Sequence, residues 1–279
     1  MEPLDVLAAI RERQSVRSYA DRLVASSTLQ QLLDFAAAAP HVTGVPPRVA
    51  LVSGVEKTEH ILTHIVGSYG LVRNAPHLLV AAMPDGTPQA QIDVGYVLEQ
   101  LVLEATHLGL GTCWITGTYD AERAGETIGL ASGEIAGAVC SLGYAADGVL
   151  DRLHDTTIRR LAGGHRRKPL REIAFSQSWA QEWDASEADS NLVEALDCAR
   201  LAPSASNRQP WRFVVAHQQV SLALVRPNYF DAGIVMSHLA LASAALGHPG
   251  RWELRLADAA WVRELGTPAG VIPIATFAT

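Results

Sequence analysis

Two stretches of the chain are apolar around nearly the whole turn of a helix. They are Asp93–Leu108 and Asp231–Leu246, and in each the aspartate is followed two residues later by a glycine. A helix that is apolar on all sides must be surrounded by protein. We therefore expect both helices to be buried and to form the central contact of the molecule.

Shorter apolar runs have the length and residue types of strands. One of them, His77–Met83, has no counterpart that we can align in the second half of the chain, so we expect this strand in the first half only. The other expected strands are Arg48–Val52, Ala138–Tyr144, Arg212–Ala216 and Val271–Ala278.

The two halves of the chain share an internal repeat. The matches include Asp, Gly, Pro and Trp, which helix periodicity does not require, so chance is a poor explanation. The second copy is shorter than the first between the aligned blocks. The aligned pairs are Gln14–Pro40 with Gln177–Pro203, Asp93–Gly109 with Asp231–Gly247, and Trp114 with Trp252.

A shorter helix is expected near the start of each copy. It should begin at Ser27 in the first copy and at Ser190 in the second, because serine is a favoured N-cap residue. Gln30 would complete a capping box in the first copy. Each helix should end before a proline, Pro40 or Pro203, since the residue before proline avoids helical geometry.

These elements predict an α+β chain made of two related α/β lobes with central buried helices. Lobe 1 should span residues 1–175 and a shortened lobe 2 residues 176–279, because the polar stretch Phe175–Ser190 lies between the copies.

Composition and charge narrow the class of protein. Of 279 residues, 48% are hydrophobic and 18% are charged, which is enough apolar mass for a core. The net charge of −7 argues against binding to nucleic acid and fits a protein that handles a small molecule.

Three features of the sequence bear on where in the cell the protein is found. The chain has no basic leader and no apolar run of about 18 residues, so we expect neither export nor a membrane segment. The cysteines, Cys113, Cys140 and Cys198, are far apart and odd in number, which favours a cytoplasmic protein without disulfides or zinc.

Two segments of lobe 1 carry polar residues or glycines that the apolar pattern does not need. Arg13, Ser15 and Arg17 alternate, so in an extended segment they share one face and offer two guanidiniums and a hydroxyl to a phosphate. A solvated connector is the alternative. Gly109–Gly117, GLGTCWITG, lets the backbone approach a planar ring, although its first glycines could simply end a helix.

Two further segments are polar. Ala202–Trp211, APSASNRQPW, offers neutral donors and acceptors that suit a polyol chain, although the same residue types favour ordinary turns. The basic run His165–Pro169, HRRKP, could complete an anion site or could be a solvated linker.

In combination these segments resemble the nitroreductase family of enzymes that use flavin mononucleotide (FMN). The matching pieces are RQSVRSY, APSASNRQPWRFVV, DVGYVLEQLVLEATHLGLGTCWITG, and LGY followed by HRRKPL. In the usual member, two subunits form a dimer and each FMN lies at their interface. One subunit supplies the arginine segment, the glycine-rich segment and the basic tail, and its partner supplies the APSxxN loop.

In this chain the pieces are divided between the two copies. The first copy has APHVTGVPPR (Ala39–Arg48) where the second has APSASNRQPW. The second copy has Ser176 and Ala180 where the first has Arg13 and Arg17, and its glycine-rich stretch is changed to GHPGRW. Each copy keeps the half-site that the other has lost, so the resemblance implies one complete FMN site and one decayed site. It also implies a pseudo-dimer within one chain, and we therefore expect a monomer or a weak homodimer.

The resemblance also assigns roles by position. Residues expected near the FMN phosphate are Arg13, Ser15, His165 and Arg167, although many members carry lysine where this chain has His165. Residues expected near the pyrimidine edge of the ring, where positive charge favours reduced flavin, are Gln14 and Arg17. Residues expected to offer backbone N–H groups to N5 and O4 are Thr116 and Gly117. Residues expected to line the ribityl chain and phosphate are Pro203, Ser204, Ala205 and Asn207.

The implied activity is an FMN-dependent oxidoreductase of the nitroreductase type. Hydride would pass from NAD(P)H through FMN to a small organic acceptor such as a nitroaromatic or a quinone. This exchange needs an open pocket rather than a nucleophile, so we expect no catalytic side chain and no metal.

Three alternatives remain open. They are an FMN-sequestering or sensor protein without turnover, an FMN-dependent dehydrogenase that passes electrons to oxygen, and a structural protein that has lost its flavin. The segment between Ser53 and Arg73 bears on the first, because it could cover or expose the ring.

Overall fold

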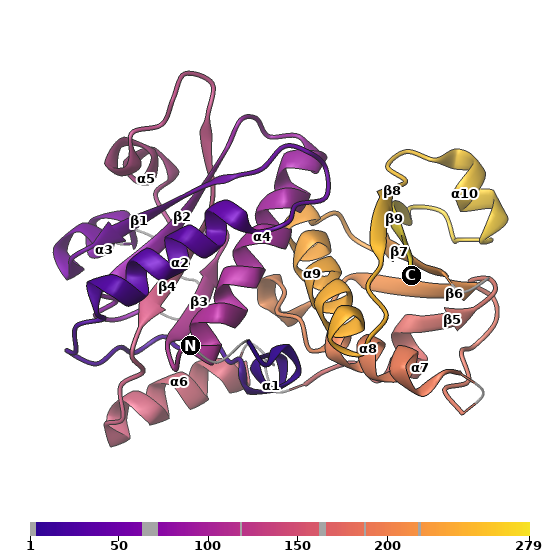
Figure 1. Ribbon diagram of the computed structural model, residues 1–279, viewed down its shortest axis with the longest axis horizontal. Coiled ribbons are helices and arrows are strands. Elements are labelled where there is room, and N and C mark those ends of the chain that lie inside the picture. Colours follow the sequence, from indigo (N-terminus) through magenta and orange to yellow (C-terminus); the bar gives the residue numbers. More distant parts are fainter. Residues whose placement is uncertain (1–3, 63–71, 118, 162–165, 187, 217–218) are drawn as a thin grey trace.

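The computed structural model describes residues 4–62, 72–117, 119–161, 166–186, 188–216 and 219–279. Two lobes lie side by side, each with its own sheet, and two long helices stand between them (Figure 1). These helices are α4 (Pro88–His107) and α9 (Tyr229–Ala245), and most of their residues are buried. The expectation that the helices apolar on all sides form the central contact is confirmed.

Helices α4 and α9 approach most tightly at a pair of aligned glycines. A Cβ atom on Gly95 would lie 2.3 Å from the carbonyl oxygen of Phe230. A Cβ atom on Gly233 would lie 2.0 Å from the carbonyl oxygen of Ile92. The two contacts correspond under the internal repeat, so the crossing has an approximate twofold relation that only glycine permits.

The first lobe contains an antiparallel sheet in the order β1-β2-β4-β3. Strand β2, expected as His77–Met83, has those bounds, and all its residues are buried. The other strands are β1 (Arg48–Ser53), β3 (Gly111–Ile115) and β4 (Ile135–Gly143). The helices of this lobe are α2 (Ser26–Ala38), α3 (Val55–Leu62), α5 (Ala121–Ile128) and α6 (Val149–Leu161).

The second lobe contains a five-stranded sheet in the order β5-β6-β7-β9-β8. Strand β5 (Ala174–Ser176) pairs with β6 in parallel, and the remaining pairs are antiparallel. The other strands are β6 (Trp211–Ala216), β7 (Gln219–Leu224), β8 (Arg251–Leu254) and β9 (Ile272–Ala278). The helices are α7 (Leu170–Ile173), α8 (Ser190–Arg200), the 3₁₀ turn η1 (Ala205–Asn207) and α10 (Ala259–Glu264).

Strand β7 corrects one expectation. It lies between β6 and β9 as β2 lies between β1 and β4, so the view that this strand exists only in the first lobe was wrong. The pattern hid it because Gln219 and Ser221 interrupt the apolar run that makes β2 conspicuous. Pairing with two neighbours stabilises such a strand even where its own sequence is a weak signal.

Helix α8 begins at Ser190 as expected, but the start of α2 and the N-caps of both helices need correction. Helix α2 begins at Ser26 with Ala25 as its N-cap and no side-chain cap bond, so Ser27 lies inside the helix. The amide of Gln30 donates to Asp34 instead of closing a capping box. For α8 the cap is Asp189, whose carboxylate accepts from two backbone N–H groups and is also favoured by the helix dipole.

Two segments cross between the lobes. Helix α1 (Val6–Glu12) packs against α4, α8 and α9, and its Ala9 and Ile10 belong to the core of the second lobe. Strand β5 extends across the boundary that we expect between residues 175 and 176, and it joins the sheet of the second lobe. The exact boundary stays a prediction.

Among the described residues, no helix is long and apolar enough to cross a bilayer.

Candidate functional site

A cavity of about 400 Å³ lies between the two lobes, within the range of small-molecule sites. The segment after α1, the end of β3 and the basic tail line it from lobe 1, and the loop with η1 and the start of α9 line it from lobe 2. Arg13 and Asn207 therefore face one shared cleft. The sequence-predicted residues in the wall are Arg13, Gln14, Ser15, Arg17, Thr116, Arg167, Pro203, Ser204, Ala205 and Asn207.

Among the described residues, one expected residue is not in this wall, namely Gly117. Gly117 directly follows Thr116 and has a φ of 88°, a backbone geometry that favours glycine. His165 lies outside the described residues, as do residues 63–71 of the segment that we expected to cover or expose the ring.

The arginine segment reaches the cavity because it packs along the edge of the first sheet. Ser15 forms a parallel bridge with Thr112 of β3, and the amide of Val16 donates to the Thr112 carbonyl at 2.8 Å. Val16 points inward onto Gly111, where a Cβ atom would lie 2.7 Å from the valine side chain. Arg13, Ser15 and Arg17 all line the cavity, and so does Gln14 between them.

An acidic residue on α6 holds this segment from outside. The carboxylate of Asp155 accepts from the backbone N–H of Arg17 and from the hydroxyl of Ser18, both at 3.1 Å. Sequence reasoning missed Asp155, because the order of residues along α6 does not reveal that a distant segment packs against it.

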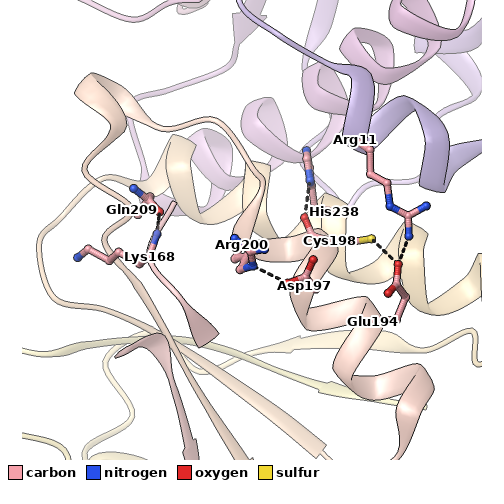
Figure 2. A network of polar contacts seen from close by, with 8 residues as sticks. All are labelled: Arg11, Lys168, Glu194, Asp197, Cys198, Arg200, Gln209 and His238. Carbon is pink, nitrogen blue, oxygen red and sulfur yellow. Dashed lines mark hydrogen bonds and ion pairs between the residues drawn. The ribbon is translucent and has the colours of Figure 1, made fainter. Parts of the chain in front are cut away.

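The basic tail is fastened to the loop of the second lobe. Gln209 accepts from the Lys168 backbone at 2.8 Å (Figure 2) and donates to the Arg166 carbonyl at 3.1 Å. The guanidinium of Arg167 donates to the Asn207 side chain and, at 3.1 Å, to the Leu201 carbonyl. These bonds overturn the alternative of a solvated linker for Arg166–Lys168.

The loop that the tail holds is conformationally strained. Ser206, Asn207 and Gln209 have φ values of 54°, 51° and 49°, in the left-handed region that costs a non-glycine residue on the order of 1–2 kcal/mol. Strain of this kind persists where surrounding contacts over-determine it, and it clusters at functional sites. The hydrogen bonds of Asn207 and Gln209 to the tail provide such contacts.

Positive charge accumulates on one side of the cavity. Burial and, to a smaller extent, the nearby charge of Arg13 together lower the pKa of Arg167 to about 10, so Arg167 remains charged at neutral pH. The Nε atom of Arg13 is buried and has no hydrogen-bond partner among the described residues. Two guanidiniums that repel each other at a half-buried wall favour an anionic ligand.

Helix α1 is anchored to the second lobe. Figure 2 shows Arg11 of α1 extending to Glu194 of α8, with which it forms an ion pair, and Arg200 bonding to Asp197 one turn further along α8. Because α1 runs directly into the arginine segment, this anchor fixes that segment relative to the loop of the second lobe.

Behind the cavity, a fully buried acid–base pair joins α4 to α9. His238 Nε2 lies 2.8 Å from Glu99 Oε1, and His238 Nδ1 lies 3.1 Å from the Cys198 carbonyl, which can only accept. Trp114, a wall residue, donates its indole N–H to Glu99 Oε2 at 2.5 Å. With Nδ1 protonated, the bond between Nε2 and Oε1 needs one further proton, so the pair as a whole is neutral.

Sequence reasoning also missed Asp231 as a wall residue. Its carboxyl lies in the first turn of α9 and accepts from the Ala205 backbone at 3.0 Å. The signal was present in the repeat, where Asp231 aligns with Asp93 although helix periodicity does not require an acid there. The agreement supports the internal repeat but does not by itself show which groups the carboxyl contacts.

Comparison with known proteins gives a family match. Residues 5–243 match the protein-family model described as "Putative TM nitroreductase". A curated relative from Methanothermobacter thermautotrophicus, "Putative NADH dehydrogenase/NAD(P)H nitroreductase", is 30% identical over 154 residues, which is 52% of this chain and 79% of the relative.

Solved structures agree with the fold. The crystal structure of a "putative nitroreductase" from Thermotoga maritima superimposes with a TM-score of 0.58 at 17% identity, covering 99% of this chain and 94% of that one. A nitroreductase with bound FMN from Bacteroides fragilis is also similar, with a TM-score of 0.45, 22% identity, and coverage of 52% of this chain and 90% of that one. The match over nearly the whole Thermotoga chain confirms the expected fold class.

Proposed function

Because this chain belongs to the family described as "Putative TM nitroreductase", we propose that it is an FMN-dependent oxidoreductase. It binds one FMN between its lobes and transfers reducing equivalents from NAD(P)H to a small organic acceptor such as a nitroaromatic or a quinone. One observation carries the proposal. Arg13 and Arg167 of the first lobe and the Ser204–Asn207 loop of the second lobe line one cavity, although each lobe alone has only half of these residues.

The chemistry of the cavity fits FMN. Its phosphate would meet Arg13 and Arg167, the first with a buried, unpartnered Nε among the described residues and the second with a pKa lowered by burial and by its neighbour. The ribityl chain is a polyol, and Ser204 and Ser206 of the second lobe also line the cavity. The cavity thus offers positive charge for the phosphate and neutral polar groups for the ribityl chain.

When bound, FMN supplies the hydride-accepting and hydride-donating chemistry, and the residues of the protein bind and orient the group. Arg17 places a positive charge at the arginine-segment side of the cavity, which favours negative charge on a ligand ring there. Thr116 and Gly117 stand at the end of β3, and we propose their backbone N–H groups as donors to the ring. Trp114 is held in the wall by its bond to Glu99.

The proposal is tested first by the absorbance spectrum of the purified protein and by reconstitution with FMN. We expect flavin bands and binding of one FMN per chain. A colourless protein that takes up no FMN would overturn the proposal. With FMN bound, NADH or NADPH should be oxidised when menadione or a nitroarene is added, and a flavin that neither nucleotide reduces would leave a binding protein instead of a reductase.

Replacing Arg167 by methionine should weaken FMN binding about 10- to 100-fold, because a hydrogen bond to a charged group contributes about 1.5–3 kcal/mol. The matched control is Arg171→Met, which removes the same charge from an exposed position on α7 and should change the affinity less than about twofold. Affinity is measured by quenching of FMN fluorescence. Equal losses in the two variants would show that only net charge matters.

A further inference from the structure

Asp231 is deeply buried, and one of its carboxylate oxygens has no hydrogen-bond partner among the described residues. The residue is 3% exposed and lines the cavity. Its Oδ1 accepts from the Ala205 backbone N–H at 3.0 Å, and among the described residues Oδ2 makes no hydrogen bond. A carboxyl oxygen in this position is free to meet a ligand.

Asp93 is the equivalent residue in the first lobe, and its hydrogen bonds differ from those of Asp231. Asp93 bonds the corresponding loop, but both its oxygens are used. Oδ1 accepts from the backbone of Val42 at 2.6 Å, and Oδ2 accepts from the backbone and hydroxyl of Thr43 and from the Val45 backbone at 3.3 Å.

Val42 aligns with Ala205 and Thr43 with Ser206. The bond from the Val42 or Ala205 amide to the aspartate is therefore common to both lobes. Among the described residues, the bonds from Thr43 and Val45 have no counterpart in the second lobe. In the second lobe the hydroxyl-bearing residue Ser206 turns to the cavity, and its φ is 54°. Asp231 has therefore kept the anchoring bond and lost the bonds that satisfied its second oxygen, on the side where the cavity lies.

The surroundings of Asp231 bring the pKa of its carboxyl close to neutral pH. Burial raises the pKa of Asp231 to about 7, against smaller lowering effects from the Ala205 N–H and the charge of Arg208. The other charged residues in the cavity wall are Arg11, Glu12, Arg13, Arg17 and Arg167. Ionisable residues on the packed helices α4 and α8 are Asp93, Tyr96, Glu99, Glu104, His107, Glu194, Asp197, Cys198 and Arg200.

We propose that Asp231 is a ligand-binding residue, whose second oxygen bonds a hydroxyl of the bound molecule and whose ionisation weakens the binding of an anionic ligand. The inference rests on the proposed function, in which the ligand is FMN with its ribityl hydroxyls and its phosphate. A protonated carboxyl donates to a hydroxyl without adding charge. An ionised carboxyl accepts from it but adds a negative charge to a buried cavity that already holds the ligand's anion.

The sign of the pH dependence follows from linkage. In the free protein the carboxyl loses its proton above about pH 7. A bound anion holds that proton more tightly, so binding above this pH takes up a proton and the affinity falls as the pH rises. The decrease approaches about tenfold per pH unit when one proton is coupled fully to binding.

The test compares FMN affinity between pH 6.5 and 9 for the natural protein and for Asp231→Asn. The asparagine keeps an oxygen for the Ala205 N–H and cannot ionise. We expect the affinity of the natural protein to fall several-fold or more across this range and that of the variant to change less than about twofold. Parallel curves for the two proteins would overturn the inference.

A second measurement needs no variant. Calorimetric titration of the natural protein with FMN at pH 8, in two buffers of different ionisation enthalpy, should show net proton uptake. The phosphate is already fully ionised there, because its second pKa is about 6. Riboflavin, which lacks the phosphate, should take up less. No proton uptake would overturn the inference and leave the proposed function intact, whereas no FMN binding at any pH would overturn the proposed function itself.

Discussion

Replacing Gly233 by alanine should destabilise the protein severely, although alanine normally stabilises a helix by about 1 kcal/mol relative to glycine. The new Cβ atom would lie 2.0 Å from the Ile92 carbonyl oxygen and 2.7 Å from the Tyr96 amide nitrogen. Both contacts are with backbone, so no side-chain rotation relieves them and α9 must move away from α4. Overpacking a core commonly costs 1–3 kcal/mol and sometimes more, and we expect at least about 3 kcal/mol here.

The loss should appear in thermal unfolding as a decrease in Tm of about 10 °C, since 1 kcal/mol corresponds to about 2–4 °C in a chain of this size. Gly95→Ala, the equivalent change in the other lobe, should behave in the same way. Gly86→Ala is the control, because its Cβ would find only Ile135 at 3.7 Å, and its free energy of unfolding should change by no more than about 0.5 kcal/mol. A neutral Gly233→Ala variant would show that the helices do not cross this closely.

Glu99→Ala is the second variant for which we expect a large effect. It removes the acceptor of the Trp114 indole N–H in the cavity wall and the partner of the fully buried His238. Breaking a buried pair by removing one member costs about 3–5 kcal/mol, because the remaining polar groups have no water to replace the lost bonds. Urea unfolding should report this decrease, and FMN affinity should fall as the Trp114 wall loses its support.

Glu99→Gln provides the matched comparison. A glutamine oxygen can accept from Trp114 while its amide donates to Nε2 of a neutral His238, whose Nδ1 still donates to the Cys198 carbonyl. Every hydrogen bond is then made without the additional proton, so we expect a cost of no more than about 1.5 kcal/mol. If the glutamine variant is as unstable as the alanine variant, the pair depends on ionic attraction and not on hydrogen-bond satisfaction.

The two kinds of variant address different properties of one architecture. Gly95 and Gly233 set the distance between the lobes, and Glu99 and His238 join the lobes next to the cavity. The candidate site exists only because both lobes are held in this arrangement. Changes in the α4–α9 interface should therefore reduce ligand binding even where no ligand-contacting residue is altered.

The sequence by itself determined the features that depend on local order along the chain. The apolar helices, the strand β2 and the alternation of Arg13, Ser15 and Arg17 follow from periodicity, which the nearest neighbours of each residue decide. The internal repeat and the division of motifs between its copies indicated that one complete site would be shared between two lobes. Together with the family resemblance, these patterns led to ten of the 19 residues that line the cavity.

Only the tertiary structure decided what the individual polar groups do. Asp93 and Asp231 are the same residue in the repeat, yet one has both oxygens bonded by its loop and the other has an oxygen available at a cavity. Asn207 bonds Arg167 across the lobes, which no spacing in the sequence reveals. The physical reason is that buried polar groups are satisfied by whichever partner packing brings within reach, and such partners lie far apart along the chain.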